Sequence, residues 1–324
     1  MAKKTESAEN SPDPISAEVF EIHRPKLFGI AYRMLGTVTE AEDAVQDTYL
    51  RWRLALQRNS IQLEETSKAN VEAAIPERVD NPEAYLVTII TRLCIDNLKS
   101  ARAKRESYIG PWLPEPLITE PVAGPEIQQE LAETLSFAFM MLLEQLSPAE
   151  RAVYILREAF NFKHQEIADI LGRSTADSRQ LNKRARTHLQ QPGRRYAATD
   201  ADQEQLFNKF LAAAAGEDMQ PLFDFLAEDI VAHTDGGGKV RAALKVLVGK
   251  PRVIEFVRRV LPGQESTSEL SLCKVNGKPA IKQTLDGNLT TIVTVQFVNA
   301  KVQQLFIVRN PEKLSRATLG QPVL

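Results

Sequence analysis

One stretch of the chain carries the side-chain types that read DNA bases. Within HQEIADILGRSTADSRQLNKRARTHL, residues 164–189, Arg179, Lys183 and Arg186 recur at the helical spacing i, i+4 and i+7, and Gln180 and Asn182 flank them. In the major groove Arg and Lys pair with guanine edges, and Asn and Gln with adenine edges. We therefore expect these side chains to contact DNA bases.

The same stretch predicts the helices that would position this reading face. Leu181, Ala185 and Leu189 recur at i, i+4 and i+8, which predicts a buried stripe on the other side of the helix. A preceding helix is expected to end at Leu171-Gly172, and Ser174 is suited to cap the next one. Two helices joined by a short turn are typical of a helix-turn-helix whose second helix enters the major groove.

Charge is strongly segregated along the chain, although the formal net charge is only −2. Residues 92–105 hold five basic residues against Asp96, a local charge of +4, and residues 173–195 hold seven against Asp177, a local +6. Every charged residue from 106 to 150 is acidic. Two basic blocks with an acidic connector indicate two contacts to a polyanion.

Composition indicates a folded, soluble protein without a membrane span. Hydrophobic residues make up 43% of the 324 residues, charged residues 25%, and no apolar run reaches 18 residues. The polar N-terminus is expected to be a disordered tail over residues 1–15 rather than a secretory signal. Cys94 and Cys273 have neither metal-site spacing nor a disulfide framework, which fits the cytoplasm; no metal or cofactor is expected.

Helix signals fill the first 190 residues. Three predicted helix starts combine a capping residue with a favourable partner: Thr39-x-x-Glu42, Asn81-Pro82 and Ser147-Pro148-x-Glu150. The polar stretch from Arg58 to Val79 is expected to be a long loop. Two helical domains are therefore predicted, at residues 16–107 and 131–192.

A proline-rich linker is expected between them, at residues 108–130. Residues 108–125, YIGPWLPEPLITEPVAGP, contain five prolines and two glycines, which favour a stiff, extended path. Trp112 is unusual there, because so large an apolar ring needs a groove. A second boundary is expected near Gln191-Pro192-Gly193.

Residues 199–324 are expected to form a separate α+β domain. Residues 202–230 predict two helices. Four strand-like runs follow, separated in part by the turn signals Asn276-Gly277 and Asp286-Gly287: ELSLCKV, KPAIKQTL, LTTIVTVQFV and KVQQLFIVR.

Together these motifs resemble the sigma factors of RNA polymerase. Residues 20–53, FEIHRPKLFGIAYRMLGTVTEAEDAVQDTYLRWR, and residues 81–106, NPEAYLVTIITRLCIDNLKSARAKRE, are similar to the two halves of sigma region two. Residues 134–190 are similar to region four. The lack of a third sigma domain between them matches the extracytoplasmic-function (ECF) class. WLPEPL, DGGGK at 235–239 and NPEKL at 310–314 resemble the subgroup with a fused SnoaL-like domain.

The resemblance implies a fold and a function. The expected fold is two all-α domains followed by an α+β SnoaL-like cone with a curved antiparallel sheet. The expected function is a non-enzymatic sigma factor that binds core RNA polymerase and promoter DNA, reading the −35 element with region four. Region two would read the −10 element with Asn81, Arg92, Asp96, Asn97, Lys99 and Arg102, and would bind core polymerase through Asp43, Gln46, Asp47 and Leu50.

The role of the C-terminal domain stays open between three interpretations. His233 and Asp235 lie together in VAHTDGGGKV and could act as acid or base in an enzyme; a small-molecule sensor and a regulatory module are the alternatives. No nucleophile, metal cluster or phosphate loop of known spacing supports catalysis. The chain could thus also be a DNA-binding regulator fused to a sensor or enzyme. The residues expected to couple the domains are Trp112, Asp235, Gly236, Gly237, Gly238 and Lys239.

Overall fold

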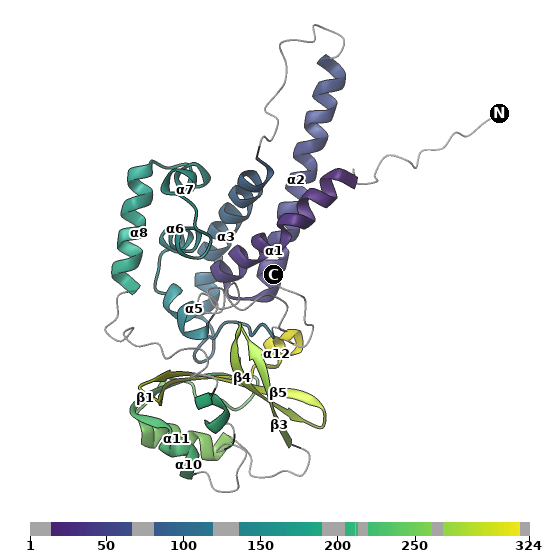
Figure 1. Cartoon of the computed structure of the whole chain (residues 1–324). Coiled ribbons are helices and arrows are strands. Elements are labelled where there is room, and N and C mark those ends of the chain that lie inside the picture. The colour runs from purple at the N-terminus through teal and green to yellow at the C-terminus, as the bar shows by residue number, and fades with distance from the viewer. Residues whose placement is uncertain are drawn as a thin grey trace, which may run out of the picture.

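The computed structural model describes residues 14–66, 81–118, 136–189, 205–210, 212, 220–260 and 268–317. A helical half holds α1 to α8, and the C-terminal half is built on one sheet, with the segment after α3 running between them (Figure 1). Predictions for residues 1–13, for 119–130 of the linker and for the boundary at 191–193 lie outside the described residues.

The first helical region contains three long helices: α1 (Pro14–Leu35), α2 (Val38–Thr66) and α3 (Pro82–Glu106). Helix α1 begins within the predicted tail. At the start of α3, Asn81 Oδ1 accepts a hydrogen bond from Ala84 N at 3.0 Å and Pro82 is the first helical residue, so this predicted start is confirmed.

Two predictions for α2 are wrong. Its capping pair is Thr37 and Glu40, where Thr37 Oγ1 accepts from Glu40 N at 3.3 Å; Glu42 instead pairs with Arg24 at 3.2 Å. The helix then continues to Thr66 through the first part of the predicted loop 58–79. The stretch to Thr66 contains no Gly or Pro to stop the helix, and polar residues such as Gln and Glu propagate it well.

The described residues of the second helical region form four shorter helices: α5 (Phe137–Leu143), α6 (Pro148–Glu158), α7 (His164–Leu171) and α8 (Thr175–Leu189). The predicted capping box of Ser147 and Glu150 is present. Gly172 ends α7 with φ of +63°, and Ser174 Oγ accepts from Asp177 N at 3.0 Å to cap α8. The predicted helix-turn-helix is confirmed.

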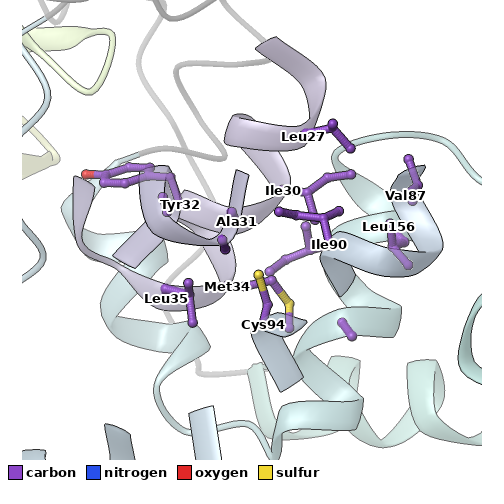
Figure 2. Close-up of a cluster of buried hydrophobic side chains, with 14 of the residues drawn as sticks. Leu27, Ile30, Ala31, Tyr32, Met34, Leu35, Val87, Ile90, Cys94 and Leu156 are labelled. Atoms are coloured by element: carbon purple, nitrogen blue, oxygen red, sulfur yellow. The ribbon is translucent and has the colours of Figure 1, made fainter. Parts of the chain in front are cut away.

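The two helical regions share one hydrophobic core. Ile30 of α1, Ile90 of α3 and Leu156 of α6 lie side by side in this cluster (Figure 2) and are almost wholly buried. Arg151 of α6 adds a polar contact, because its Nη1 donates to the Met34 carbonyl of α1 at 2.7 Å. Regions two and four therefore pack directly against each other.

The C-terminal half is a six-stranded sheet with the order β2-β1-β6-β5-β4-β3. Its elements are α10 (Gln220–Asp224), β1 (Leu226–Asp235), β2 (Leu247–Val248), α11 (Lys250–Val260), β3 (Ser268–Val275), β4 (Lys278–Leu285), β5 (Asn288–Val298), β6 (Lys301–Val308) and α12 (Pro311–Ala317). The four predicted strands and both predicted turns are confirmed. Asn276 and Asp286 have φ of 54° and 51°, as tight hairpin turns require.

Strand β1 corrects two predictions. Leu226–Ile230 was expected to be helical, but it pairs with β6, and that long-range pairing overrides the local preference of Leu, Ala and Glu for a helix. The pairing of β1 with β6 is parallel, so the sheet is mixed rather than antiparallel. The α+β class itself is confirmed.

The two faces of the sheet pack against different partners. Leu305 and Ile307 of β6 belong to the cluster that contains α10 and α11. Phe306 and Val308, which alternate with them, belong to the cluster that contains Leu113 of the linker. The linker therefore runs along the face of the sheet that looks toward the helical half.

Candidate functional site

Helix α8 presents most of the predicted reading face to solvent. Arg179, Gln180 and Lys183 are exposed. Arg186 is exposed too, but its Nη2 lies 2.6 Å from Glu158 Oε1, and the hydrogen bond to that carboxylate raises the Arg186 pKa. Cationic side chains are thus available on one side of the helix.

Asn182, which was predicted to flank this face, is instead buried at 6% exposure. It lies four residues after Ser178 and three before Ala185, both fully buried, so it belongs to the inner stripe of α8. Leu181, predicted for that stripe, is only partly buried. The side of α8 that faces the core is therefore turned about the helix axis, away from the side that the spacing predicted.

Helix α3 carries the residues predicted for the −10 element. Asp96 and Lys99 are exposed and pair with each other at 2.8 Å, Asn97 is partly buried, and Asn81 caps the helix. The side chain of Arg102 lies outside the described part of the structure. These positions lie along one helix.

Arg92 has a different partner from the one expected. Its Nε donates to the carbonyl of Ile170 near the end of α7, at 3.1 Å. A cation that was predicted to contact DNA therefore joins region two to region four in this arrangement.

The face predicted to bind core polymerase lies on α2. Asp43, Gln46, Asp47 and Leu50 are all exposed. Leu54, one turn further on, is 53% exposed and extends the same stripe, which sequence reasoning missed. Its spacing of four residues from Leu50 would have indicated that both side chains lie on the same face of the helix.

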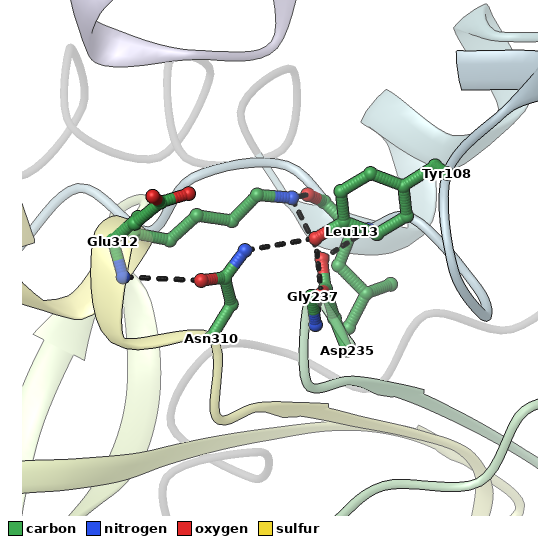
Figure 3. A network of polar contacts seen from close by, with 7 residues as sticks. Tyr108, Leu113, Asp235, Gly237, Asn310 and Glu312 are labelled. Carbon is green, nitrogen blue, oxygen red and sulfur yellow. Dashed lines mark hydrogen bonds and ion pairs between the residues drawn. The ribbon is translucent and has the colours of Figure 1, made fainter. Parts of the chain in front are cut away.

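A buried carboxylate joins the linker to the C-terminal domain (Figure 3). Asp235, at the end of β1, is 0% exposed. Its Oδ1 accepts hydrogen bonds from Tyr108 Oη at 2.6 Å and Gly237 N at 3.0 Å, and its Oδ2 accepts from Leu113 N at 2.9 Å and Lys313 Nζ at 2.7 Å. We call these residues and their direct partners the Asp235 network.

Lys313 of α12 completes the network. Its side chain is 9% exposed, and its ammonium donates to the Leu113 carbonyl at 2.5 Å and lies over the Trp112 ring, 4.5 Å from the centroid. Asn310 Nδ2 donates to Tyr108 Oη at 2.8 Å. Burial, followed by the contact with Asp235, raises the Tyr108 pKa. The WLPEPL, DGGGK and NPEKL motifs, far apart in sequence, therefore meet at one place.

The glycines of DGGGK are needed for this approach. Gly237 and Gly238 have φ of +59° and +71°, which L-residues with side chains rarely adopt. A Cβ on Gly238 would lie 2.8 Å from Cδ1 of Ile109 in the linker, and one on Gly237 would collide with Asn310. Lys239, which follows them, pairs with Glu312.

A second polar cluster ties the linker to region two. Asn276, in the turn between β3 and β4, is fully buried, and its backbone N and Oδ1 bond to the Leu117 backbone at 2.7 and 2.8 Å. Its Nδ2 donates to Tyr32 Oη of α1 at 2.8 Å, and that hydroxyl donates to the Glu115 carbonyl at 2.6 Å. Sequence reasoning identified Asn276 only as a turn residue.

His233 and Asp235 lie on the wrong face of the sheet to act in the cavity of the C-terminal domain. His233 stacks on Phe306, with centroids 5.4 Å apart, on the linker side, and burial lowers its pKa. The cavity lies on the other face, among Phe210, Phe223 and Ile307. Among the described residues that line it, the polar ones are Gln283 and Thr291, and none is an acid or a base.

Within the described ranges, no helix is both long and apolar enough to span a bilayer. The same ranges hold no group of three His, Cys, Asp or Glu side chains that could bind a metal ion, and Cys94 and Cys273 are free.

The helix-turn-helix carries exposed cations, and α3 is a second basic helix. Together they define a DNA-binding protein with two helical modules. Family models agree: residues 19–61 match "Sigma-70 region 2" and residues 136–189 match "Sigma-70, region 4".

Full-length relatives extend this result to the C-terminal domain. The chain is 33% identical over 317 residues to the ECF RNA polymerase sigma factor SigJ of Mycobacterium tuberculosis, covering 93% of this chain and 94% of that one. It is 27% identical to the probable ECF sigma factor SigI of the same species, covering 95% and 98%. The crystal structure of M. tuberculosis SigJ matches with a TM-score of 0.66 and 28% identity, over 95% and 100% of the two chains. The chain belongs to the ECF RNA polymerase sigma factors.

Proposed function

We propose that this sigma factor directs core polymerase by placing region two at the −10 element and region four at the −35 element, and that its C-terminal domain restrains both regions in cis. The observation that carries this proposal is the Asp235 network, because it fastens the linker between the two regions to the sheet.

The restraint works through the spacing of the two DNA-binding regions. Both regions have to reach separate promoter elements at once, so their distance controls avidity. Here they share one core, and Arg92 is held by Ile170 of α7. Opening would free Arg92 and separate the regions, and promoter binding would follow the population of the open state.

In vitro transcription with core polymerase tests the restraint. Trp112→Ala removes the ring under Lys313, and Gly237→Val forces a collision with Asn310, so both variants are expected to loosen the linker and change promoter-dependent transcription several-fold. Gly287→Val is the matched control, because Gly287 also has a positive φ but a Cβ there meets nothing within 4 Å.

Two results would contradict the proposal. The first is wild-type transcription by both the Trp112 and the Gly237 variants. The second is an equal change of transcription in the Gly287 variant, because the effect would then come from a general loss of stability in the domain. Binding of the region-four helix-turn-helix to its −35 DNA is expected to stay unchanged in all three variants.

The apolar cavity supports a second candidate role as a sensor. A site lined by Phe210, Leu222 and Phe223, with Gln283 and Thr291 as its polar groups, suits an uncharged, largely apolar small molecule. The described lining residues include no titratable group, which acid–base chemistry needs in reach of the substrate. Thermal stabilisation by hydrophobic compounds, lost in a cavity-filling Thr291→Leu variant, would support the sensor.

A further inference from the structure

Arg309 carries a donor that the described residues do not satisfy. It follows β6, and its backbone N donates to the Asp235 carbonyl at 2.7 Å. Its Nη1 donates to the Arg241 carbonyl, also at 2.7 Å, while its Nε is buried and has no partner within the described ranges. A buried donor without an acceptor costs about 1–3 kcal/mol.

Arg241 lies next to it on a well-anchored segment. Val240 N donates to the Gly236 carbonyl at 3.3 Å, and Ala243 N donates to Thr234 Oγ1 at 2.8 Å, so the backbone is held on both sides of Arg241. The Arg241 side chain is exposed, and its guanidinium has no hydrogen bond or ion pair with any described residue. The backbone beneath the Arg241 side chain is therefore anchored, while its exposed guanidinium can turn toward a ligand.

These two like charges have no counter-ion among the described residues, whereas three other cations of this domain do. Lys239 pairs with Glu312, Lys250 with Glu228 and Arg259 with Glu255. Within the described part of the chain no carboxylate pairs with Arg241 or Arg309. Burial, and to a smaller extent the charge of Arg241, lower the Arg309 pKa.

We propose that Arg241 and Arg309 form a binding site for a phosphate group, beside the Asp235 network. A guanidinium is planar and presents parallel N–H donors that match phosphate oxygens. One phosphate would neutralise both charges, and a shift of the partly exposed Arg309 side chain would let its buried Nε donate to that phosphate. A phosphate in this position comes either from the backbone of promoter DNA or from a free phosphate or phosphorylated small molecule.

Calorimetric titration of the full-length protein with inorganic phosphate, at constant ionic strength against chloride, tests the site. Wild type is expected to bind phosphate, and Arg241→Gln to bind it at least tenfold more weakly. Arg241→Gln is expected to fold normally, since this exposed guanidinium has no hydrogen bond or ion pair with a described residue. Should it not fold, Arg241→Lys replaces it and is expected to bind phosphate more weakly, because the planar fork is lost. Arg252→Gln is the matched control, because Arg252 is also an exposed arginine of the C-terminal domain but lies on α11, away from the proposed site.

The salt dependence of promoter binding by the reconstituted holoenzyme distinguishes the two sources. If DNA supplies the phosphate, Arg241→Gln is expected to reduce the slope of log K against log salt by about 0.9, while Arg252→Gln leaves it unchanged. If Arg241→Gln loses phosphate binding but leaves the slope for promoter binding unchanged, the site binds a free phosphate rather than DNA. The proposal is overturned if the Arg241 and Arg252 variants behave alike in both measurements, or if wild type binds no phosphate and the slope does not change.

Discussion

Two interfaces hold this chain in one arrangement, and they depend on different interactions. Regions two and four meet mainly through apolar side chains such as Ile30, Ile90 and Leu156, to which Arg92 and Arg151 add hydrogen bonds. The linker meets the C-terminal domain partly through the apolar contact of Leu113, but its distinctive feature is the buried ion pair of Asp235 and Lys313. Apolar contact is non-directional and tolerates small shifts. A buried ion pair is directional, and loss of one partner leaves the other charge uncompensated. The linker interface is therefore the better suited of the two to act as a switch.

The largest expected effect comes from breaking the polar interface. Asp235→Ala leaves the Lys313 ammonium buried without its carboxylate and is expected to cost about 3–5 kcal/mol of unfolding free energy, measured by urea denaturation. Lys239→Gln breaks the exposed pair with Glu312 in the same loop and is expected to cost less than about 1 kcal/mol. Equal losses in the two variants would show that burial of the pair contributes nothing.

A smaller effect is expected on the reading face, which lies outside both interfaces. Arg179→Ala removes an exposed cation from α8 and is expected to weaken promoter binding by about 1–3 kcal/mol at matched salt, with unchanged stability. Lys183→Ala is expected to behave in the same way. Arg184→Ala, on the same helix but away from the stripe, is the control. Full promoter affinity in both the Arg179 and the Lys183 variants would refute the assigned face.

The smallest effect is expected in the apolar interface. Ile90→Val removes one methylene from the core shared by both helical regions and is expected to cost about 0.5–1.5 kcal/mol in the same urea titration. Transcription at low temperature is expected to change less than in Gly237→Val, because the contact remains apolar and loses only one methylene. A change in transcription as large as that of Gly237→Val would contradict the contrast between the two interfaces.

Short-range chemistry made several features predictable from the sequence. Asn81, Ser147 and Ser174 cap their helices, and Asn276-Gly277 and Asp286-Gly287 make their turns, because each device acts within about four residues. The helix-turn-helix and the sigma motifs were recognisable for the same reason. At this range the side-chain type alone selects the backbone conformation.

Features that depend on distant partners were decided by the tertiary structure. Strand β1 forms because β6 is there to pair with it, and Asn182 is buried because α8 packs against its neighbouring helices at that angle. Sequence reasoning singled out Trp112 and DGGGK and expected them to lie near each other, yet it did not identify Lys313 as the partner of Asp235. Hydrogen bonds between residues 113, 235 and 313 depend on positions in space that no local pattern encodes, since only the folded chain brings those groups within bonding distance.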